Sequence, residues 1–243
     1  MIHFVTYGNY KYKRQKDALT LSAKKSDWFD IVTAYGPSDL DDNFTSKFKH
    51  VLEEEHGGGY WIWKPYIISK NLNEISDNDV LIYLDAGCEL NLDGKKRFQE
   101  YIEIVKNSEN GILSFELYNG FGSGEPLVEK NWNNEFLFEY FKVNNDSSIR
   151  NTPQLVGGIL IMRKCKNVMD IFADSLNILN DRPDFFKNCK RHDQSILSVI
   201  RKIHGTELIP DETYFKESTK IHPLGWNDPF SKQFPFHAKR HRR

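Results

Sequence analysis

Residues 80–87 read Val-Leu-Ile-Tyr-Leu-Asp-Ala-Gly, a near-continuous apolar run that ends in a carboxylate and a glycine. Such a run is typical of a strand that is covered on both faces. Asp85 follows the strand directly, and a charge there is costly unless it faces solvent, a cation or a hydrogen-bonding ligand. Gly87 gives the backbone freedom and lets a ligand approach closely. The stretch predicts a strand over Val80–Leu84 with Asp85 at a binding site, or else Asp85 as a simple turn cap.

On both sides of this strand, apolar strand-like runs alternate with amphipathic helix-like runs. This alternation predicts an α/β fold with a mostly parallel central sheet and helices on both faces. The predicted strands are His3–Tyr7, Asp30–Tyr35, Val80–Leu84, Ile112–Phe115 and Val156–Arg163. The predicted helices are Lys13–Lys25, Lys64–Asn71, Lys95–Lys106, Glu135–Phe141, Asn167–Leu179 and Gln194–His204. Ligands of open α/β sheets bind beyond the carboxyl ends of the strands, so we expect the site there.

The alternation fades after residue 210, which predicts one domain over residues 1–210 and a C-terminal cover segment with a basic tail over 211–243. Four of the last five residues are Lys or Arg. A solvated tail is the simplest interpretation of this cluster, and peripheral contact with a membrane or with nucleic acid is the alternative.

The composition is that of a globular chain, with 39% hydrophobic and 28% charged residues among 243. The formal net charge of -1 argues against a protein that coats nucleic acid. We expect neither a transmembrane segment, which needs about 20 apolar residues, nor a secretory signal. Three separated cysteines (Cys88, Cys165 and Cys189) argue against a disulfide scaffold and predict a cytoplasmic, reducing location.

Three further stretches carry candidate site residues. In His192-Asp193-Gln194, Asp193 opens a helix whose apolar face is predicted at Ile196, Val199, Ile200 and Ile203, so its carboxylate points toward a cleft. An ordinary first-turn acid, favoured by the helix dipole, is the alternative.

In the stretch from His56 to Pro65, three glycines precede Tyr60, Trp61 and Trp63. Lys64 is the cation of this stretch and could bind a phosphate, or lie on the surface beside packed indoles.

Gly157 and Gly158 interrupt an apolar strand, which indicates a bulge or the close approach of a ligand or another backbone.

The order of these motifs resembles that of GT-A type glycosyltransferases over residues 2–205. The corresponding stretches are Phe4-Val5-Thr6-Tyr7-Gly8, Tyr83-Leu84-Asp85-Ala86-Gly87, Gly157-Gly158-Ile159-Leu160 and His192-Asp193-Gln194-Ser195. Gly-Tyr-Trp-Ile-Trp-Lys-Pro followed by Tyr-Leu-Asp-Ala-Gly is also similar to a group of poorly characterised bacterial and viral glycosyltransferases. The resemblance implies a GT-A-like domain that moves a sugar from a nucleotide-diphosphate donor, UDP-linked in the commonest case, to a hydroxyl of a glycan or protein acceptor.

The resemblance also implies roles for individual residues. Asp193 and Asp85 would be catalytic, Trp61 and Trp63 would stack on the acceptor, and Asp85 and His222 would hold Mn²⁺ or Mg²⁺. The donor would contact Tyr7, Gly8, Lys64, Asp85, Ala86, Gly87, Gly157, Gly158, His192 and Gln194.

One departure affects the metal. GT-A enzymes usually carry Asp-x-Asp, and here Gly87 stands in place of the second Asp. Either Asp85 holds a metal with help from Glu89 or a distant ligand, or no metal is used and cations such as Lys64 support the leaving diphosphate. A nucleotidyltransferase is a second candidate, although Tyr7-Gly8-Asn9-Tyr10 is a poor version of its glycine-rich loop. A catalytically inactive module that binds nucleotide-sugar or carbohydrate is the third.

Overall fold

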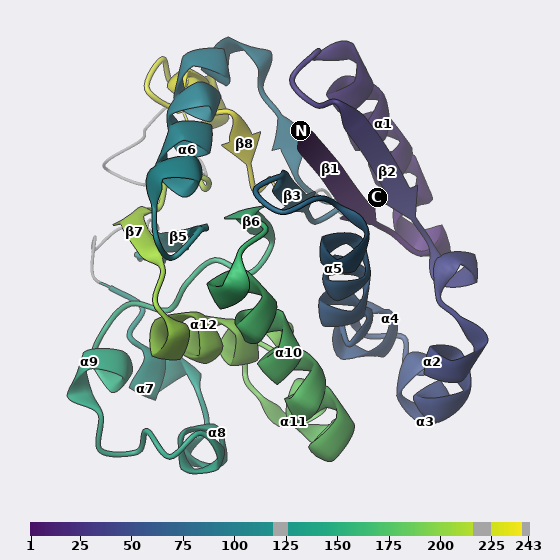
Figure 1. Cartoon of the computed structure of the whole chain (residues 1–243), viewed down its shortest axis with the longest axis vertical. Helices are drawn as coiled ribbons and strands as arrows, with labels where there is room; N and C mark the ends of the chain where they lie inside the picture. The colour runs from purple at the N-terminus through teal and green to yellow at the C-terminus, as the bar shows by residue number, and fades with distance from the viewer. Residues whose placement is uncertain (119–125, 216–224, 240–243) are drawn as a thin grey trace.

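A six-stranded sheet forms the centre of the computed structural model, which describes residues 1–118, 126–215 and 225–239 (Figure 1). Its strands are β1 Ile2–Tyr7, β2 Ile31–Tyr35, β3 Val80–Leu84, β5 Ile112–Glu116, β6 Ile159–Arg163 and β7 Glu207–Pro210, in the order β2-β1-β3-β6-β5-β7. β6 runs antiparallel to β3 and β5, and the other described pairs of this sheet are parallel. The mostly parallel sheet predicted from the sequence is therefore confirmed.

Helices cover both faces of this sheet. The α-helices are α1 Lys13–Lys25, α2 Asp42–Lys47, α3 Lys49–Leu52, α4 Gly57–Tyr60, α5 Trp63–Glu74, α6 Lys95–Asn107, α7 Glu129–Trp132, α8 Glu135–Tyr140, α9 Ser147–Arg150, α10 Lys166–Asp181, α11 Asp184–Asn188 and α12 Asp193–His204. Single 3₁₀ turns lie at Tyr10–Tyr12, Pro37–Asp39, Leu92–Gly94, Gly225–Asn227 and Ser231–Gln233. In the described part of the chain, no helix combines the length and the apolar character needed to span a membrane.

The sheet separates two hydrophobic cores because successive strand residues point to opposite faces. On one face, Leu81 and Tyr83 of β3 pack in a cluster with buried residues of α5, α10 and α12. On the other face, Val80, Ile82 and Leu84 pack with residues of α1 and α6. Both sides of β3 are thus buried, which agrees with its near-continuous apolar sequence.

The long helices lie within about three residues of the predicted ranges, whereas β7 and several short helices were not predicted, and two further details differ. β3 and α1 have the predicted bounds, but β6 begins at Ile159 rather than Val156. The ladder is interrupted at Gly157, whose amide donates to the side chain of Gln194, although the amide of Val156 still donates to the carbonyl of Phe115 at 2.9 Å. Ile203 is 41% exposed, so the prediction that it lies on the buried face of α12 is wrong.

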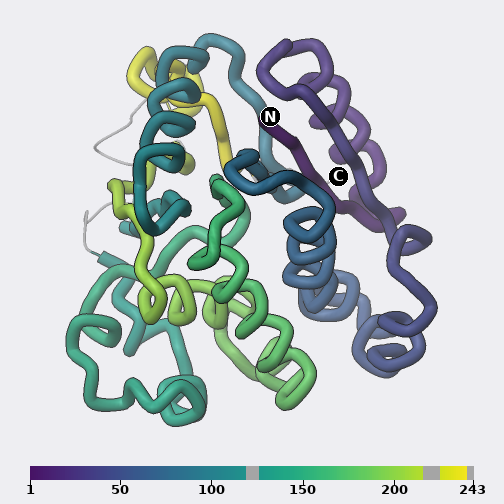
Figure 2. The backbone as a smooth tube through the Cα atoms, viewed as in Figure 1, coloured from purple at the N-terminus to yellow at the C-terminus, as the bar shows by residue number. Residues whose placement is uncertain are grey.

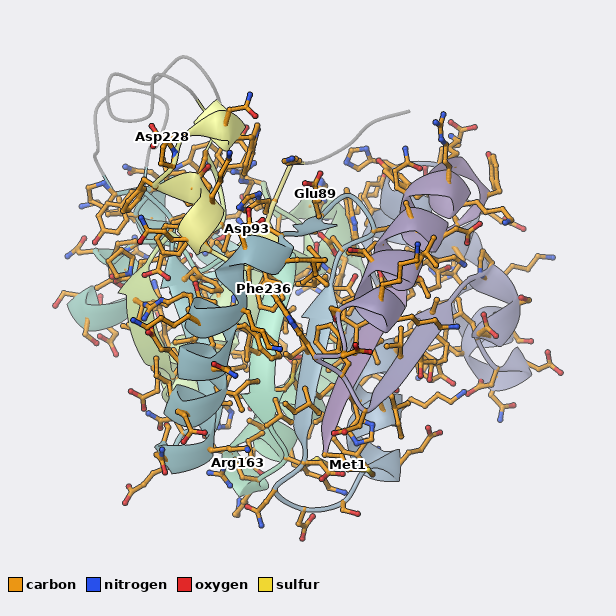
Figure 3. The ribbon with its side chains drawn as sticks, turned by 90° about the horizontal axis from the view of Figure 1, so that it is seen from above. Met1, Glu89, Asp93, Arg163, Asp228 and Phe236 are labelled. Atoms are coloured by element: carbon orange, nitrogen blue, oxygen red, sulfur yellow. The ribbon has the colours of Figure 1, made fainter. Side chains whose placement is uncertain are left out.

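The C-terminal segment returns to the centre of the molecule. In the second, two-stranded sheet, β4 Glu89–Leu90 pairs antiparallel with β8 Phe236–His237. Figure 2 shows this yellow segment running back past the chain that follows β3. Met1 and Arg163 mark one end of the main sheet, and Glu89 and Asp93 lie towards the other (Figure 3). β8 thus lies at the end of the sheet where Asp85 follows β3.

Candidate active site

A cavity of about 380 Å³ opens at the carboxyl ends of β1 and β3, beside the N-terminus of α12. This is the edge at which open α/β sheets bind ligands. All the predicted site residues of the described chain line it: Tyr7, Gly8, Trp61, Trp63, Lys64, Asp85, Ala86, Gly87, Gly157, Gly158, His192, Asp193 and Gln194. His222 lies outside the described residues. His56 and Gly57, from the candidate stretch that ends at Pro65, also line it. Sequence reasoning assigned no role to the other lining residues: Asn9, Tyr12, Cys88, Val156, Lys190, Arg191 and Ala238.

Lys64 joins the two predicted catalytic carboxylates at the floor of the cavity. Its Nζ lies 2.5 Å from Asp193 Oδ2, 3.1 Å from Asp85 Oδ1 and 3.1 Å from the carbonyl oxygen of Gly157. An ammonium group has three N–H donors, so these three oxygens use all of them. The geometry favours Lys64 as the residue that holds both carboxylates. Its predicted contact with a phosphate remains a prediction, and these three partners weigh against it.

The two carboxylates differ in burial. The side chain of Asp193 is 7% exposed and that of Asp85 is 35% exposed, whereas Lys64 is only 2% exposed. Burial raises the pKa of Asp193 to about 6, although Lys64 opposes the shift. Burial also lowers the pKa of Lys64, but the two carboxylates outweigh this effect, so its pKa is raised overall. At neutral pH Asp193 is therefore mostly ionised beside the Lys64 ammonium.

Asp85 presents one oxygen to its neighbours and the other to the cavity wall. Its Oδ1 accepts a hydrogen bond from the hydroxyl of Tyr83 at 2.7 Å in addition to the ion pair with Lys64. Burial, followed by the charge of Asp85, raises the pKa of Tyr83 well above its usual value, so this hydroxyl keeps its proton. Asp85 Oδ2 faces Gly158, where an added Cβ would lie only 2.6 Å away. Because Gly158 has no side chain, the Asp85 carboxylate fits at this position.

The backbone of Gly157 and Gly158, here called the glycine corner, forms hydrogen bonds with Asp85 and with Gln194. The carbonyl of Gly158 accepts from the amide of Asp85 at 2.8 Å, and the amide of Gly157 donates to Gln194 Oε1 at 3.1 Å. A Cβ on Gly157 would lie 3.0 Å from the Cα of Gln194. The two glycines therefore let β6 approach both β3 and α12, as their position in an apolar strand predicted.

Gln194 belongs to a buried polar network that sequence reasoning did not find. Its Nε2 donates to Gln154 Oε1 at 2.7 Å, and Gln154 Nε2 contacts Glu129 Oε2 at 3.4 Å. Glu129 is fully buried and pairs with Lys202 at 2.8 Å. The network connects α7 and α12 to the glycine corner. Buried, connected polar groups of this kind fix a single geometry.

The glycine-rich stretch forms a left-handed turn that continues through two aromatic residues. Gly57, Gly58 and Gly59 have positive φ, as have Tyr60 (φ 53°) and Trp61 (φ 61°). Two bulky residues in this region store backbone strain of roughly 1–3 kcal/mol each. Trp61 stacks on the ring of His192 with centroids 5.3 Å apart, and this contact opposes relaxation of the turn.

Tyr7 and Trp63 form the apolar wall of the cavity. Their rings stack with centroids 3.9 Å apart, and both side chains are almost completely buried. Trp63 Nε1 also donates to the carbonyl of Gly57 at 3.0 Å. Trp63 is thus tied into the core, whereas Trp61 is half-buried; their predicted contacts with an acceptor remain predictions.

The described residues do not by themselves fit a divalent metal. They contain no group of three or more His, Cys, Asp or Glu side chains that could hold one. Asp193 is bound to Lys64, and an ammonium beside both carboxylates repels a second cation. The predicted pair of ligands, Asp85 and His222, remains a prediction because only Asp85 is described.

Comparisons with known proteins identify the fold. No family model and no curated protein matches the sequence. Among solved structures, the chain is similar to a glycosyltransferase involved in the glycosylation of the major capsid of PBCV-1, with a TM-score of 0.56 and 12% identity over 99% of this chain and 96% of that chain. Mouse xyloside xylosyltransferase 1 aligns over 98% and 97% of the two chains, with a TM-score of 0.49 and 11% identity. The galactosyltransferase LgtC, solved with donor and acceptor sugar analogues, aligns over 88% and 75%, with a TM-score of 0.47 and 14% identity.

The first of these similarities extends over nearly the whole of both chains. It shows that this chain has a GT-A-like α/β fold, as the order of its motifs predicted. At such low identity the similarity shows the fold alone.

Proposed function

We propose that this chain is a glycosyltransferase that moves a sugar from a nucleotide-diphosphate donor, with UDP as the first candidate nucleotide, to a hydroxyl of a glycan or protein acceptor. The observation that carries the proposal is the Lys64–Asp85–Asp193 cluster at the floor of the cavity. The position of the cavity at the carboxyl ends of β1 and β3, where α/β sheets bind ligands, also supports the proposal.

The charges of this cluster suit a reaction in which positive charge develops on a sugar. Two carboxylates and one ammonium leave one net negative charge in a largely buried site. Preorganised charges of this kind stabilise a transition state whose charge is opposite. Asp85, whose side chain lines the cavity and is 35% exposed, would accept a hydrogen bond from a donor-sugar hydroxyl.

The chemical step uses the chain's own residues. The bond between the anomeric carbon and the diphosphate oxygen breaks, and its electron pair leaves with the diphosphate. The acceptor oxygen forms a new bond to the anomeric carbon, and its proton passes to the carboxylate of Asp193. A pKa of about 6 suits this role, because a general base works best when its pKa lies near the working pH.

Asp193→Asn tests the assignment. We expect sugar transfer to fall at least 100-fold, since general base catalysis contributes roughly that much or more, while donor affinity changes only a few-fold. Donor binding is measured by thermal shift with UDP-, GDP-, CMP- and dTDP-linked sugars, each in Mn²⁺, Mg²⁺ and EDTA. Turnover of the donor that binds is then measured with and without candidate acceptors.

The control variant is Asp184→Asn, which removes an exposed carboxylate paired with Arg182 outside the cavity. It should leave transfer unchanged. Wild-type turnover by Asp193→Asn would contradict the base assignment. A donor that binds and stays intact with the wild-type chain would instead indicate a binding module. Loss of the thermal shift in EDTA would show that a metal takes part.

A further inference from the structure

One buried charge takes no part in the proposed mechanism. Arg201 belongs to the last turn of α12, and its side chain is completely buried. Its guanidinium donates to the hydroxyl of Ser114 at 2.9 Å and to the carbonyls of Val156 and Leu197 at 2.9 and 3.1 Å. These acceptors are neutral oxygen atoms, and among the described residues no carboxylate pairs with this guanidinium. A buried charge without an ionised partner is costly, so charges farther away must offset part of the cost.

The charge that Arg201 balances lies at the floor of the cavity. Two carboxylates and one ammonium meet there, so the floor has one negative charge in excess. Glu129, a carboxylate buried elsewhere beside α12, is already paired with Lys202 at 2.8 Å. Among the described residues, Lys64 and Arg201 are the two Lys or Arg side chains that are almost completely buried. Because Lys64 already belongs to the floor, Arg201 is the buried cation that can offset the excess.

The side chain of Arg201 runs back along α12 toward Asp193. The two residues are eight positions apart on this helix, which separates their Cα atoms by about 12 Å. Arg201 Nε donates to the carbonyl of Leu197, one turn nearer to Asp193, so the guanidinium lies on the Asp193 side of its own Cα. Burial lowers the pKa of Arg201 to about 10, and the charges of Glu129 and Asp193 oppose this shift. The interaction is mutual, so the guanidinium favours the ionised form of Asp193.

The guanidinium also holds the backbone that anchors Lys64. The carbonyl of Val156 accepts from Arg201 at 2.9 Å. The amide of the same peptide group belongs to Gly157 and donates to Gln194 at 3.1 Å. The carbonyl of Gly157 then accepts from Lys64 Nζ at 3.1 Å. Arg201 and Lys64 therefore hold two successive carbonyls where the chain enters the glycine corner, and connected buried contacts of this kind fix a single geometry.

We propose that Arg201 is a positioning residue of the active site, whose buried guanidinium balances the charge of the floor and keeps the carboxylate of Asp193 ionised. The inference rests on the proposed function, because Asp193 is the general base assigned there. Arg201 is not among the residues that line this cavity, so it acts through its charge and through the backbone. Its effect on Asp193 is smaller than that of Lys64, which binds the carboxylate directly.

The first test measures the ionisation of Asp193 without any substrate. Carbon-13 NMR of a chain labelled at the aspartate carboxyl groups follows a pH titration, and Asp193→Asn identifies the signal. We expect Arg201→Gln, which keeps a hydrogen-bond donor but no charge, to raise the pKa of Asp193 by roughly 0.5–1 unit. Arg201→Lys, which keeps the charge, should restore a value close to that of the wild type. A merely structural role would make the two variants alike.

Two controls separate charge from packing. Ser114→Ala removes one acceptor of the guanidinium but no charge, so it should leave the pKa of Asp193 unchanged even where it lowers stability. Arg182→Gln removes an exposed guanidinium that is paired with Asp184 outside the cavity, and it should leave this pKa unchanged as well.

Thermal unfolding tests the same interaction in case Arg201→Gln folds poorly. Without the guanidinium the floor keeps an unbalanced negative charge, and Asp193→Asn removes that charge. At about pH 8, where Asp193 is ionised, we expect Asp193→Asn to raise the melting temperature of the Arg201→Gln chain more than that of the wild type. Should the single variant not fold at all, the double variant should recover folding.

The proposal would be overturned by an unchanged pKa of Asp193 in Arg201→Gln, or by an equal rise in Arg201→Lys. Additive changes in melting temperature, or a double variant that stays unfolded, would overturn it too. These outcomes are separable from failure of the proposed function, because neither measurement needs a donor or an acceptor. A raised pKa of Asp193 in a family of variants whose parent turns over no nucleotide-sugar would keep the counter-charge and reject the transferase.

Discussion

The carboxylate of Asp193 lies between two opposing influences. Burial raises its pKa from the usual 3.8 to about 6, while the Lys64 ammonium 2.5 Å away lowers it. At pH values between 3.8 and about 6, Asp193 keeps a proton in the folded chain that it releases in the unfolded chain. The contribution of Asp193 to the free energy of unfolding therefore decreases as the pH rises through this window. The folded chain gives up some stability at neutral pH to keep an ionised carboxylate there, which is typical of functional sites.

We expect kcat/KM for sugar transfer to fall as the pH decreases through about 6, because protonated Asp193 cannot accept the proton of the acceptor. Lys64→Met should move this limb to higher pH, since it removes the charge that favours ionised Asp193. The measurement is a pH–rate profile of both chains, with donor binding followed by thermal shift at each pH. A wild-type profile that stays flat between about pH 7.5 and 5 would reject Asp193 as the base.

The sequence predicts the members of this cluster but not their contact. Asp85 follows from the end of an apolar strand and Asp193 from the start of an amphipathic helix, and each is inferred alone. Lys64 and Asp193 are 129 positions apart, so only the tertiary fold brings them to one place. Lys190 and Arg191 could have been noticed as a basic pair directly before the His192-Asp193-Gln194 motif. Ala238 offers no chemical signal in the sequence.

The start of β6 shows how one element serves both packing and chemistry. Gly157 contacts the backbone of α12, which cannot move aside, whereas Gly158 contacts the side chain of Asp85, which can. Adding a methyl group to each glycine therefore has a different consequence. A methyl group on Gly157 strains the packing of this backbone against α12, whereas a methyl group on Gly158 displaces the side chain of Asp85.

Gly157→Ala should lower the free energy of unfolding by about 1–3 kcal/mol, because the new Cβ would overpack against α12. Gly158→Ala should cost less stability but weaken donor binding and transfer about tenfold or more, since it pushes the Asp85 carboxylate aside. Chemical denaturation and donor thermal shift measure the two effects. Gly36→Ala is the control, because its Cβ would meet neighbours at ordinary contact distances of 3.4 Å and beyond. Equal effects of the two site changes on binding would contradict this division of roles.

Elements with a long periodic pattern were predictable, and short ones were not. β3 and α1 have the predicted bounds. Burial of β3 on both faces leaves a continuous apolar run in the sequence, and burial of α1 on one face leaves a helical period of apolar residues. Helices such as α3 and α9 contain four residues each, which is too short to show a helical period. β4 and β8 contain two residues each and exist only because they pair with one another. Pairing between distant segments leaves no local signal.

At the scale of the whole molecule, the C-terminal segment packs as part of the core. Phe236 is 1% exposed and lies in the same hydrophobic cluster as β3 and α6. Two residues later, Ala238 lines the cavity. The division into residues 1–210 and a cover segment over 211–243 remains a prediction, and this packing argues that the two parts unfold together.

We expect Phe236→Ala to lower the free energy of unfolding by about 3–5 kcal/mol, in one transition, because it empties a fully packed position in the core. Donor binding should weaken as well, since β8 positions the residue that lines the cavity. Phe230→Ala, in the same segment but at a side chain that is 46% exposed, should change stability by less than about 1 kcal/mol. Denaturant unfolding followed by tryptophan fluorescence compares the variants. A Phe236→Ala chain with wild-type stability would show that residues 225–239 pack on a core that does not need them. Unfolding in a single, earlier transition would show instead that the floor of the cavity and its C-terminal edge depend on the same core.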